Sequence, residues 1–174
     1  MSNLGYESEK VLEENLVKQL RADGYEYVKI NDIDDLHRNF RKQINKHNAK
    51  RLNGHELSDK EFERLLVKIQ GKGVYGSSKT LRSLQDILMD DGRVEYIELF
   101  NTKNNEWCKN EFQVTHQVTM IGKYENRYDV TLFVNGLPLI QIELKARGKT
   151  LKEAVNQIER YRRTSYKELY KFIQ

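Results

Sequence analysis

Two acidic residues and a lysine lie close together in a stretch that is predicted to form a β-hairpin. They are Asp129, Glu143 and Lys145, within the run from Asn126 to Lys145. A pair of carboxylates suits Mg²⁺, which takes one or two of them, keeps several waters and uses substrate phosphate oxygens for its remaining positions. A lysine close by would place an ammonium beside an attacking water and the phosphate. These residue types are the parts of a metal-dependent phosphodiesterase.

The hairpin is predicted from apolar residues that alternate along two arms. They are Val130, Leu132 and Val134 on the first arm and Ile140, Ile142 and Leu144 on the second. Side chains of a strand alternate between its faces with a period of two. The apolar residues therefore face the core, and Asp129, Glu143 and Lys145 share the other face. The plainer alternative is that these three are solvated residues on an outer face.

The turn of this hairpin sets its register. A two-residue loop at Asn135-Gly136 would place apolar residues of one arm opposite polar residues of the other. We therefore expect a longer loop, with Gly136 in the left-handed conformation next to a bulge, which pairs Phe133 with Leu137.

In that register Asp129 lies opposite Gln141 and diagonal to Glu143. Diagonal neighbours are separated by roughly 7 to 8 Å between backbones, so both carboxylates can reach one cation. The expected register is thus compatible with a metal site.

A helix is predicted directly after the hairpin, because Thr150 and Glu153 form a capping box ahead of apolar residues at helical spacing. Gln157 and Tyr161 lie one turn apart on this helix. A surface amide and a tyrosine at the rim of the core are the plain interpretation of that pair.

These segments resemble a known motif. Tyr128-Asp129, then Glu143 to Lys145, then Gln157 to Tyr161 resemble the PD-(D/E)XK nuclease motif with the trailing Gln-x-x-x-Tyr element of RecB-like nucleases. More narrowly, residues 111 to 165 resemble the amino-terminal endonuclease domain of the restriction (R) subunit of type I restriction-modification enzymes. Tyr128 stands where the motif has its proline, a residue that supplies backbone shape and no ligand.

The resemblance implies a restriction-endonuclease-like α/β fold, in which helices flank a central mixed β-sheet. It implies that Asp129 and Glu143 bind Mg²⁺, or Mn²⁺ in its place, and that Lys145 is the catalytic lysine. Gln157 and Tyr161 would support the site or contact DNA phosphates.

Related nucleases also bring an acid of the first helix to the metal. Glu13 is the nearest match in this sequence, and Glu14 and Glu9 are alternatives.

Composition is compatible with one catalytic domain over residues 1–174. Hydrophobic residues make up 38% of the chain, which argues against disorder, although 32% of the residues are charged. The single cysteine, Cys108, excludes an internal disulfide and fits a reducing compartment. No membrane span or signal peptide is evident, so we expect a cytoplasmic protein.

Basic residues gather in two segments that could contact a phosphate backbone. The segment from Lys145 to Gln174 holds nine Lys or Arg residues and three Glu residues, and a second basic run spans Arg38 to Arg51. Solvated helix faces are the alternative in both cases.

Other elements are expected from apolar periodicity and end signals. The predicted helices are 9–23, a helix that carries the basic run 38–51, one that begins with the capping box Ser58-Glu61, and 79–89. The helix with the basic run has Leu36, Phe40 and Ile44 on its apolar side. The predicted strands are 26–30, 94–100 and 111–121. His116 falls on the apolar face of the last strand, where a satisfied core histidine is a more common role than a metal ligand.

We expect a Mg²⁺-dependent endonuclease domain that hydrolyses phosphodiester bonds of double-stranded DNA. The alternative is a DNA-binding or subunit-docking module on a nuclease-like fold that no longer cuts. An apolar run near residue 170 suggests a fragment of a larger motor subunit. If so, the resemblance implies ATP use in the missing region and methyltransferase and specificity subunits as partners.

Overall fold

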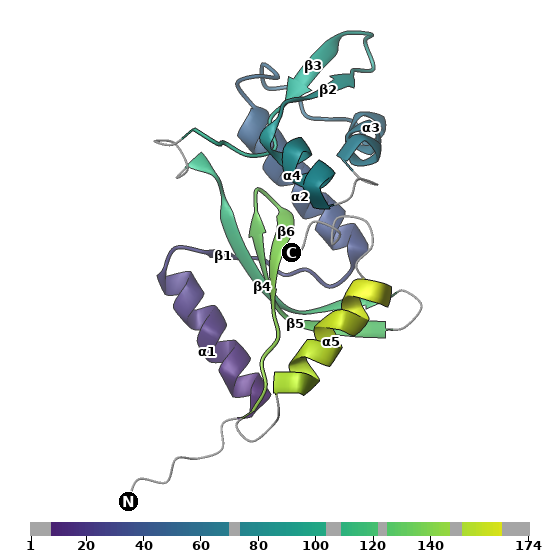
Figure 1. Cartoon of the computed structure of the whole chain (residues 1–174). Coiled ribbons are helices and arrows are strands. Elements are labelled where there is room, and N and C mark those ends of the chain that lie inside the picture. Colours follow the sequence, from purple (N-terminus) through teal and green to yellow (C-terminus); the bar gives the residue numbers. More distant parts are fainter. Residues whose placement is uncertain (1–7, 70–73, 104–108, 122–124, 147–150, 165–174) are drawn as a thin grey trace, which may run out of the picture.

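A computed structural model describes residues 8–69, 74–103, 109–121, 125–146 and 151–164 (Figure 1). Its helices are α1 (Glu9–Ala22), α2 (Ile33–Asn48), α3 (Asp59–Ile69), α4 (Val74–Arg82) and α5 (Leu151–Thr164). Its strands are β1 (Glu26–Tyr27), β2 (Gln85–Leu88), β3 (Val94–Ile97), β4 (Phe112–Ile121), β5 (Glu125–Val134) and β6 (Leu137–Ile142). The order of elements confirms an α/β protein. In the described part of the chain, no helix combines the length and the hydrophobicity that crossing a membrane requires.

A mixed sheet forms the lower half of the molecule in Figure 1, with α1 on its left and α5 on its right. The strand order is β1-β4-β5-β6, in which β1 is parallel to β4 and the other neighbours are antiparallel. The sheet therefore carries the predicted hairpin, β5 and β6, at one edge and holds it between two helices.

Helix α1 begins at a cap that its sequence supplies, because the side chain of Ser8 accepts a hydrogen bond from the N–H of Val11. Gly24 follows its end with φ +98°, a left-handed conformation that glycine adopts without strain. Val17 of α1 is buried in a cluster with Val114 and Val130 of the sheet. This packing fixes α1 against one face of β4 and β5.

Helix α2 joins the upper part of the molecule to the sheet. Its predicted apolar residues, Leu36, Phe40 and Ile44, are fully buried in one core cluster that also contains Phe133 and Leu137 of the hairpin. The hairpin turn lies directly against this helix, since a Cβ atom at Gly136 would be 2.7 Å from the Cα of Phe40. The core thus continues from α2 into the end of the sheet.

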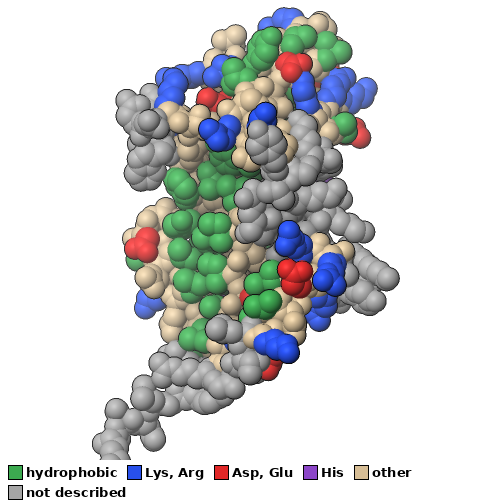
Figure 2. All heavy atoms as spheres, viewed as in Figure 1, with side chains coloured by type: hydrophobic (Ala, Val, Ile, Leu, Met, Phe, Trp, Pro, Cys, Tyr) green, Lys and Arg blue, Asp and Glu red, His purple; other side chains and the backbone are tan. Residues whose placement is uncertain are grey.

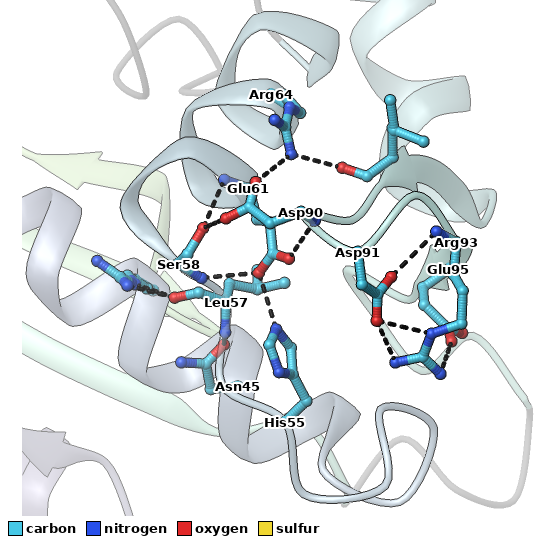
Figure 3. A network of polar contacts seen from close by, with 12 residues as sticks. Asn45, His55, Leu57, Ser58, Glu61, Arg64, Asp90, Asp91, Arg93 and Glu95 are labelled. Carbon is cyan, nitrogen blue, oxygen red and sulfur yellow. Dashed lines mark hydrogen bonds and ion pairs between the residues drawn. The ribbon is translucent and has the colours of Figure 1, made fainter.

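The capping box predicted at Ser58 and Glu61 is confirmed and lies in a larger network (Figure 3). The N–H of Ser58 donates to Glu61 Oε2 at 2.8 Å, and the N–H of Glu61 donates to Ser58 Oγ at 3.2 Å. His55 Nε2 and the N–H of Asp90 also contact the two oxygens of Glu61, at 2.8 and 2.9 Å. One buried carboxylate therefore ties the start of α3 to the turn between β2 and β3.

The predicted turn of the β5–β6 hairpin is wrong. Val134 pairs with Leu137 across the two-residue loop Asn135-Gly136, and both loop residues have positive φ, as a type I′ turn requires. The loop is held from outside the hairpin, because the buried Asn135 exchanges hydrogen bonds with Glu111 and donates to the carbonyl of Leu99.

Further along the hairpin, a bulge shifts the pairing of β5 with β6 by one residue. Phe133 pairs with Pro138 and Leu132 with Ile140, so Leu139 is the extra residue. Thr131 then pairs with Gln141, whereas the sequence had placed Asp129 there. Continued by two residues, the observed register brings Asp129 level with Glu143.

The helix predicted over 79–89 is also wrong. Helix α4 ends at Arg82, and residues 85–88 form strand β2. The side-chain amide of Gln85 donates to the carbonyls of Thr80 and Ser83, which satisfies acceptors that the end of a helix leaves open. The spacing of four residues between Leu84 and Leu88 fits one face of a helix and one face of an extended segment equally well. In the structure both leucines are exposed on one face of an extended segment.

At the level of Asp129, side chains on one face of strands β4 and β5 stop packing against α1, and the next ones along the same face pack elsewhere. On β5, Val130 packs in the α1 cluster, whereas Tyr128 packs against Tyr161 of α5, with ring centroids 4.9 Å apart. On β4, the change occurs at Gln117, which has φ +56° and lies between His116, paired with Val130, and Val118, paired with Tyr128. The alternation of side chains between the two faces of the sheet is therefore interrupted at Gln117 and Asp129.

Candidate metal centre

The structure brings together Asp129 and Glu143, the two carboxylates that the sequence singled out. Asp129 is buried in the middle of β5, and its Oδ2 accepts a hydrogen bond from the N–H of Leu144 at 2.8 Å. This bond fixes the side chain of Asp129 next to the backbone that directly follows Glu143. The part of that face on β5 is buried, since Thr131 and Phe133 beside Asp129 have no exposed surface, whereas Glu143 and Lys145 are half-buried.

The environment of Glu143 disfavours its ionised form. Burial and the negative charge of Asp129 raise the pKa of Glu143 to about 7, although Gln141 donates to one oxygen and the ammonium of Lys145 attracts the carboxylate. The other oxygen, Oε2, is buried and has no hydrogen-bond partner in the described residues. The two carboxylates therefore lie close together, Asp129 buried and Glu143 half-buried with one buried oxygen.

Lys145 lies between this pair and the start of α1. Its Nζ is 3.9 Å from Glu9 Oε2, and the N–H of Ala146 donates to Glu9 Oε1 at 3.4 Å. Glu9 had been an alternative for the acid of the first helix, and the structure gives it a contact with the lysine. The cation is thus held at the end of β6, close to Glu143.

Glu13 is a buried acid on the sheet side of α1. Its Oε2 accepts from Gln117 Nε2 at 2.9 Å and lies 3.8 Å from His116 Nδ1. Gln117 lies at the level of Asp129 on the neighbouring strand, so Glu13 approaches the centre from the α1 side. The described residues contain no group of three or more acidic, histidine or cysteine side chains that could hold a metal ion, and Glu13 stays a prediction as a ligand.

Gln157 and Tyr161 fasten α5 to the strand that carries Asp129. The amide of Gln157 donates to the Tyr161 hydroxyl, which in turn donates to the carbonyl of Arg127 at 2.8 Å. Burial raises the pKa of the Tyr161 hydroxyl, the hydrogen bond from Gln157 lowers it, and the charge of Glu143 raises it further. Tyr161 therefore lies within electrostatic reach of the carboxylate pair and positions β5.

Sequence reasoning missed Gln117, because nothing in its residue type signals a positive φ within a strand. It also described His116 as a satisfied core residue, whereas Nδ1 of His116 is buried without a hydrogen-bond partner in the described residues. Thr150 and Cys108, named in the sequence predictions, lie outside the described residues. The helix that Thr150 was expected to cap does begin at Leu151.

Basic side chains accompany the centre on α5. Figure 2 shows them intermixed with acidic side chains at the lower right, where α5 lies. Arg162 and Arg163 are exposed, and both lie near Glu159, at 3.7 and 3.9 Å. The positive charge of this helix is therefore partly offset by its own glutamate.

The arrangement combines an adjacent pair of carboxylates, a lysine next to it and a helix with exposed arginines. Two carboxylates with an unpartnered oxygen are a donor set for a hard divalent cation. A nearby ammonium and arginines suit a phosphate group. The side chains present are thus of the types that suit a divalent cation and a phosphate group.

Comparison with known proteins shows similarity along nearly the whole chain. The family model described as "Type I restriction enzyme R protein N terminus" matches residues 6–174. The SsaAORF53P type I restriction enzyme endonuclease subunit of Staphylococcus saprophyticus is 46% identical over 169 residues, which are 97% of this chain and 18% of that protein. The EcoprrI endonuclease subunit of Escherichia coli is 38% identical over 178 residues, covering 97% of this chain and 55% of that protein.

A relative matched over a shorter stretch is the putative MjaVIIIP type I restriction enzyme endonuclease subunit of Methanocaldococcus jannaschii, 38% identical over 95 residues, 51% of this chain and 9% of that protein. The chain thus spans about a fifth of the staphylococcal relatives that it matches, at 18% of their length. By the extent of the family match, the chain belongs to the family of type I restriction enzyme R protein N-terminal domains.

Proposed function

We propose that this chain is a metal-dependent DNA endonuclease domain with a PD-(D/E)XK site. The observation that carries the proposal is the adjacent pair of the buried Asp129 and the half-buried Glu143, in which Glu143 Oε2 has no partner in the described residues and the pKa of Glu143 is raised to about 7. Perturbed carboxylates next to one another are typical of functional sites. The relatives' printed name, endonuclease subunit, agrees with this chemistry.

The residues fit a divalent cation. Like charges that are buried together are costly without a counterion, and a hard cation such as Mg²⁺ or Mn²⁺ prefers oxygen ligands. Asp129 and Glu143 would hold the ion, with Glu13 as a further candidate from α1. When bound, such an ion neutralises charge that develops on phosphorus and lowers the pKa of water.

The remaining groups would orient the reactants. Lys145 is held by Glu9, 3.9 Å from its Nζ, and would place an ammonium beside the phosphate under attack. Tyr161 and Gln157 would keep β5 and α5 at a fixed separation, because the hydroxyl of Tyr161 bonds to the carbonyl of Arg127. The exposed arginines of α5 would contact the DNA backbone without selecting a sequence.

The whole protein's partners follow from the relatives. Because those relatives are type I restriction enzyme subunits, we infer that the longer protein works in a complex with methyltransferase and specificity subunits in the cytoplasm. ATP would be used by a motor region outside this sequence.

The test combines metal binding and cleavage. Calorimetric titration of Mn²⁺ and Mg²⁺ into the chain, with a supercoiled-plasmid nicking assay beside it, is compared for wild type, Asp129→Asn and Glu143→Gln. Glu159→Gln serves as the matched control, since it removes one negative charge from an exposed position of α5.

We expect metal binding by the wild type and the control, and its loss in both site variants. Nicking, where the isolated chain shows it, should fall by a factor of about 10² or more in the site variants. Equal binding by all four proteins would overturn the metal centre, and would leave the non-cutting DNA-binding or docking module as the better description.

A further inference from the structure

A groove runs between α1 and the β1 side of the sheet, next to the candidate metal centre. Its volume is about 190 Å³, and its lining consists of Glu14, Val17, Lys18, Arg21, Tyr27 and His116. The helix residues recur at intervals of three and four, so one face of α1 forms one wall. The strands supply the other wall. The proposed catalytic roles use none of these six side chains.

Two cations of this groove lack an acidic partner in the part of the chain that the structure describes. Lys18 and Arg21 are exposed one turn apart on α1, and neither forms an ion pair within the described residues. The only acid in the lining, Glu14, lies 3.9 Å from Lys10, which faces it from outside the groove. The groove therefore carries a net positive charge that is available to an anion such as a phosphate.

An aromatic ring lies beside these cations. Tyr27 is 38% exposed at the edge of the sheet, and its ring centroid is 5.8 Å from that of His116. Arg21 Cζ lies 5.9 Å from the same ring centroid. A partly exposed ring with an imidazole and a guanidinium beside it has the composition of a surface on which a nucleic-acid base stacks.

The groove continues toward the metal centre through a short chain of contacts. His116 pairs with Val130, the neighbour of Asp129 on β5. Glu13 lies 3.8 Å from His116 and 2.9 Å from Gln117, which is level with Asp129. Since adjacent strands are about 4.8 Å apart, a strand of nucleic acid in the metal centre would have its neighbouring nucleotides within reach of this groove.

We propose that the groove binds one unstacked nucleotide of the DNA strand whose phosphodiester lies in the metal centre. Its base stacks on Tyr27 and its phosphate binds Lys18 and Arg21. The proposal rests on the proposed function for the identity of the ligand as DNA. It specifies a single-stranded segment, because the face of a base is not available inside a duplex.

The experiment measures fluorescence anisotropy of a labelled oligothymidylate in EDTA, so that neither metal nor cleavage contributes. A duplex of the same length and an oligouridylate are run beside it. Tyr27→Ala is compared with Tyr27→Phe, which keeps the ring, and with Tyr96→Ala, which removes a tyrosine that is 53% exposed on β3. Lys18→Ala with Arg21→Ala is compared with Lys60→Ala with Arg82→Ala, a pair of equal charge elsewhere.

We expect Tyr27→Ala to weaken binding of the single strand about tenfold, within the range for loss of one base stack. Tyr27→Phe and Tyr96→Ala should bind as the wild type does, and the duplex should respond less to Tyr27→Ala. The Lys18 and Arg21 variant should lower the slope of log affinity against log salt by roughly 0.7 for each phosphate that it no longer neutralises. Tighter binding of the oligouridylate would point to RNA and overturn the assignment to DNA.

Equal binding by wild type and Tyr27→Ala would overturn the groove proposal, as would an equal loss in Tyr96→Ala. The same titration in Asp129→Asn separates this result from the proposed function. A Tyr27-dependent affinity in a wild-type chain that neither binds metal nor nicks DNA would defeat the nuclease proposal alone. Metal-dependent nicking with no effect of Tyr27→Ala would defeat the groove alone.

Discussion

Two glutamates of this chain, the buried Glu61 and the half-buried Glu143, show opposite behaviour. Glu61 in the upper part of the molecule accepts hydrogen bonds from the backbone of Ser58 and Asp90 and contacts His55 (Figure 3). Burial acts to raise its pKa, but the bonds from His55, Asp90 and Ser58 outweigh it, and the pKa of Glu61 is lowered from its ordinary value. Glu143 at the sheet faces Asp129 instead, and its pKa is raised to about 7.

The difference separates a structural carboxylate from a candidate functional one. The charge of Glu61 is compensated within the fold, so it needs nothing from outside. The charge of Glu143 is opposed by that of Asp129, and Glu143 Oε2 has no partner in the described residues. The ionised form of Glu143 therefore gains from an added cation. Burial alone does not distinguish the two roles, whereas the identity of the neighbours does.

Removing each carboxylate gives the largest predicted contrast. Glu61→Ala should reduce the free energy of unfolding by about 3 kcal/mol, because the buried N–H groups of Ser58 and Asp90 lose their acceptor and α3 loses its cap. Glu143→Ala should cost less than about 1 kcal/mol in EDTA, since it also removes repulsion with Asp129. Urea unfolding monitored by circular dichroism measures both, and equal losses would contradict the distinction.

Glu143, which contributes little to stability in EDTA, should become important for stability when metal is added. At a free concentration a hundred times its dissociation constant, Mg²⁺ or Mn²⁺ should raise the free energy of unfolding of the wild type by about 2.7 kcal/mol. Glu143→Gln should lose this gain, because it removes one of the two charges that favour the ion. Thermal melts with and without metal test this, with Glu159→Gln as the variant that keeps the response.

Features that depend on residues close together in the chain could be predicted from the sequence. The capping box at Ser58 and Glu61 depends on residues three apart, and the stripe of Leu36, Phe40 and Ile44 depends on one helical period, so both were predicted correctly. The contact of Asp90 with Glu61 joins segments 29 residues apart, and no local pattern indicates it. His55 is only six residues from Glu61, but the loop between them has no regular period that would indicate their contact.

The candidate centre was predicted in its residues but not in its register. Asp129 and Glu143 do lie together, yet the turn at Asn135 is fixed by Glu111 and Leu99, which lie outside the hairpin. The change of layer at Gln117 likewise results from tertiary packing against α1 and α5. A period of two describes an unbent strand and cannot locate such a point.

The pH dependence of stability in EDTA should differ in sign between the two glutamates. The pKa of Glu143 in the folded chain, about 7, is above its ordinary value of 4.5, so the native state holds that proton more tightly. Its contribution is complete below pH 4.5 and is lost as the pH rises to about 7. Glu61 has a lowered pKa, so its contribution is present above its ordinary value of 4.5 and is lost as the pH falls further.

The measurement is urea unfolding of wild type and Glu143→Gln at pH 5 and pH 8. The difference between the two proteins isolates Glu143, because the contribution of Glu61 is common to both. We expect the variant to gain on the wild type by about 1 kcal/mol between these two pH values. A constant difference would show that Glu143 is compensated in the fold, as Glu61 is.

The smallest effect concerns His55, a partner of Glu61 that reaches solvent. The side chain of His55 is 46% exposed, so water can replace its hydrogen bond when it is removed, whereas water cannot replace the buried backbone donors of Ser58 and Asp90. His55→Ala should therefore cost only about 0.5 to 1 kcal/mol at pH 8 in the same urea assay. A loss as large as that of Glu61→Ala would mean that the imidazole, and not the backbone, stabilises the buried charge, and the contrast with Glu143 would then depend on one exposed side chain.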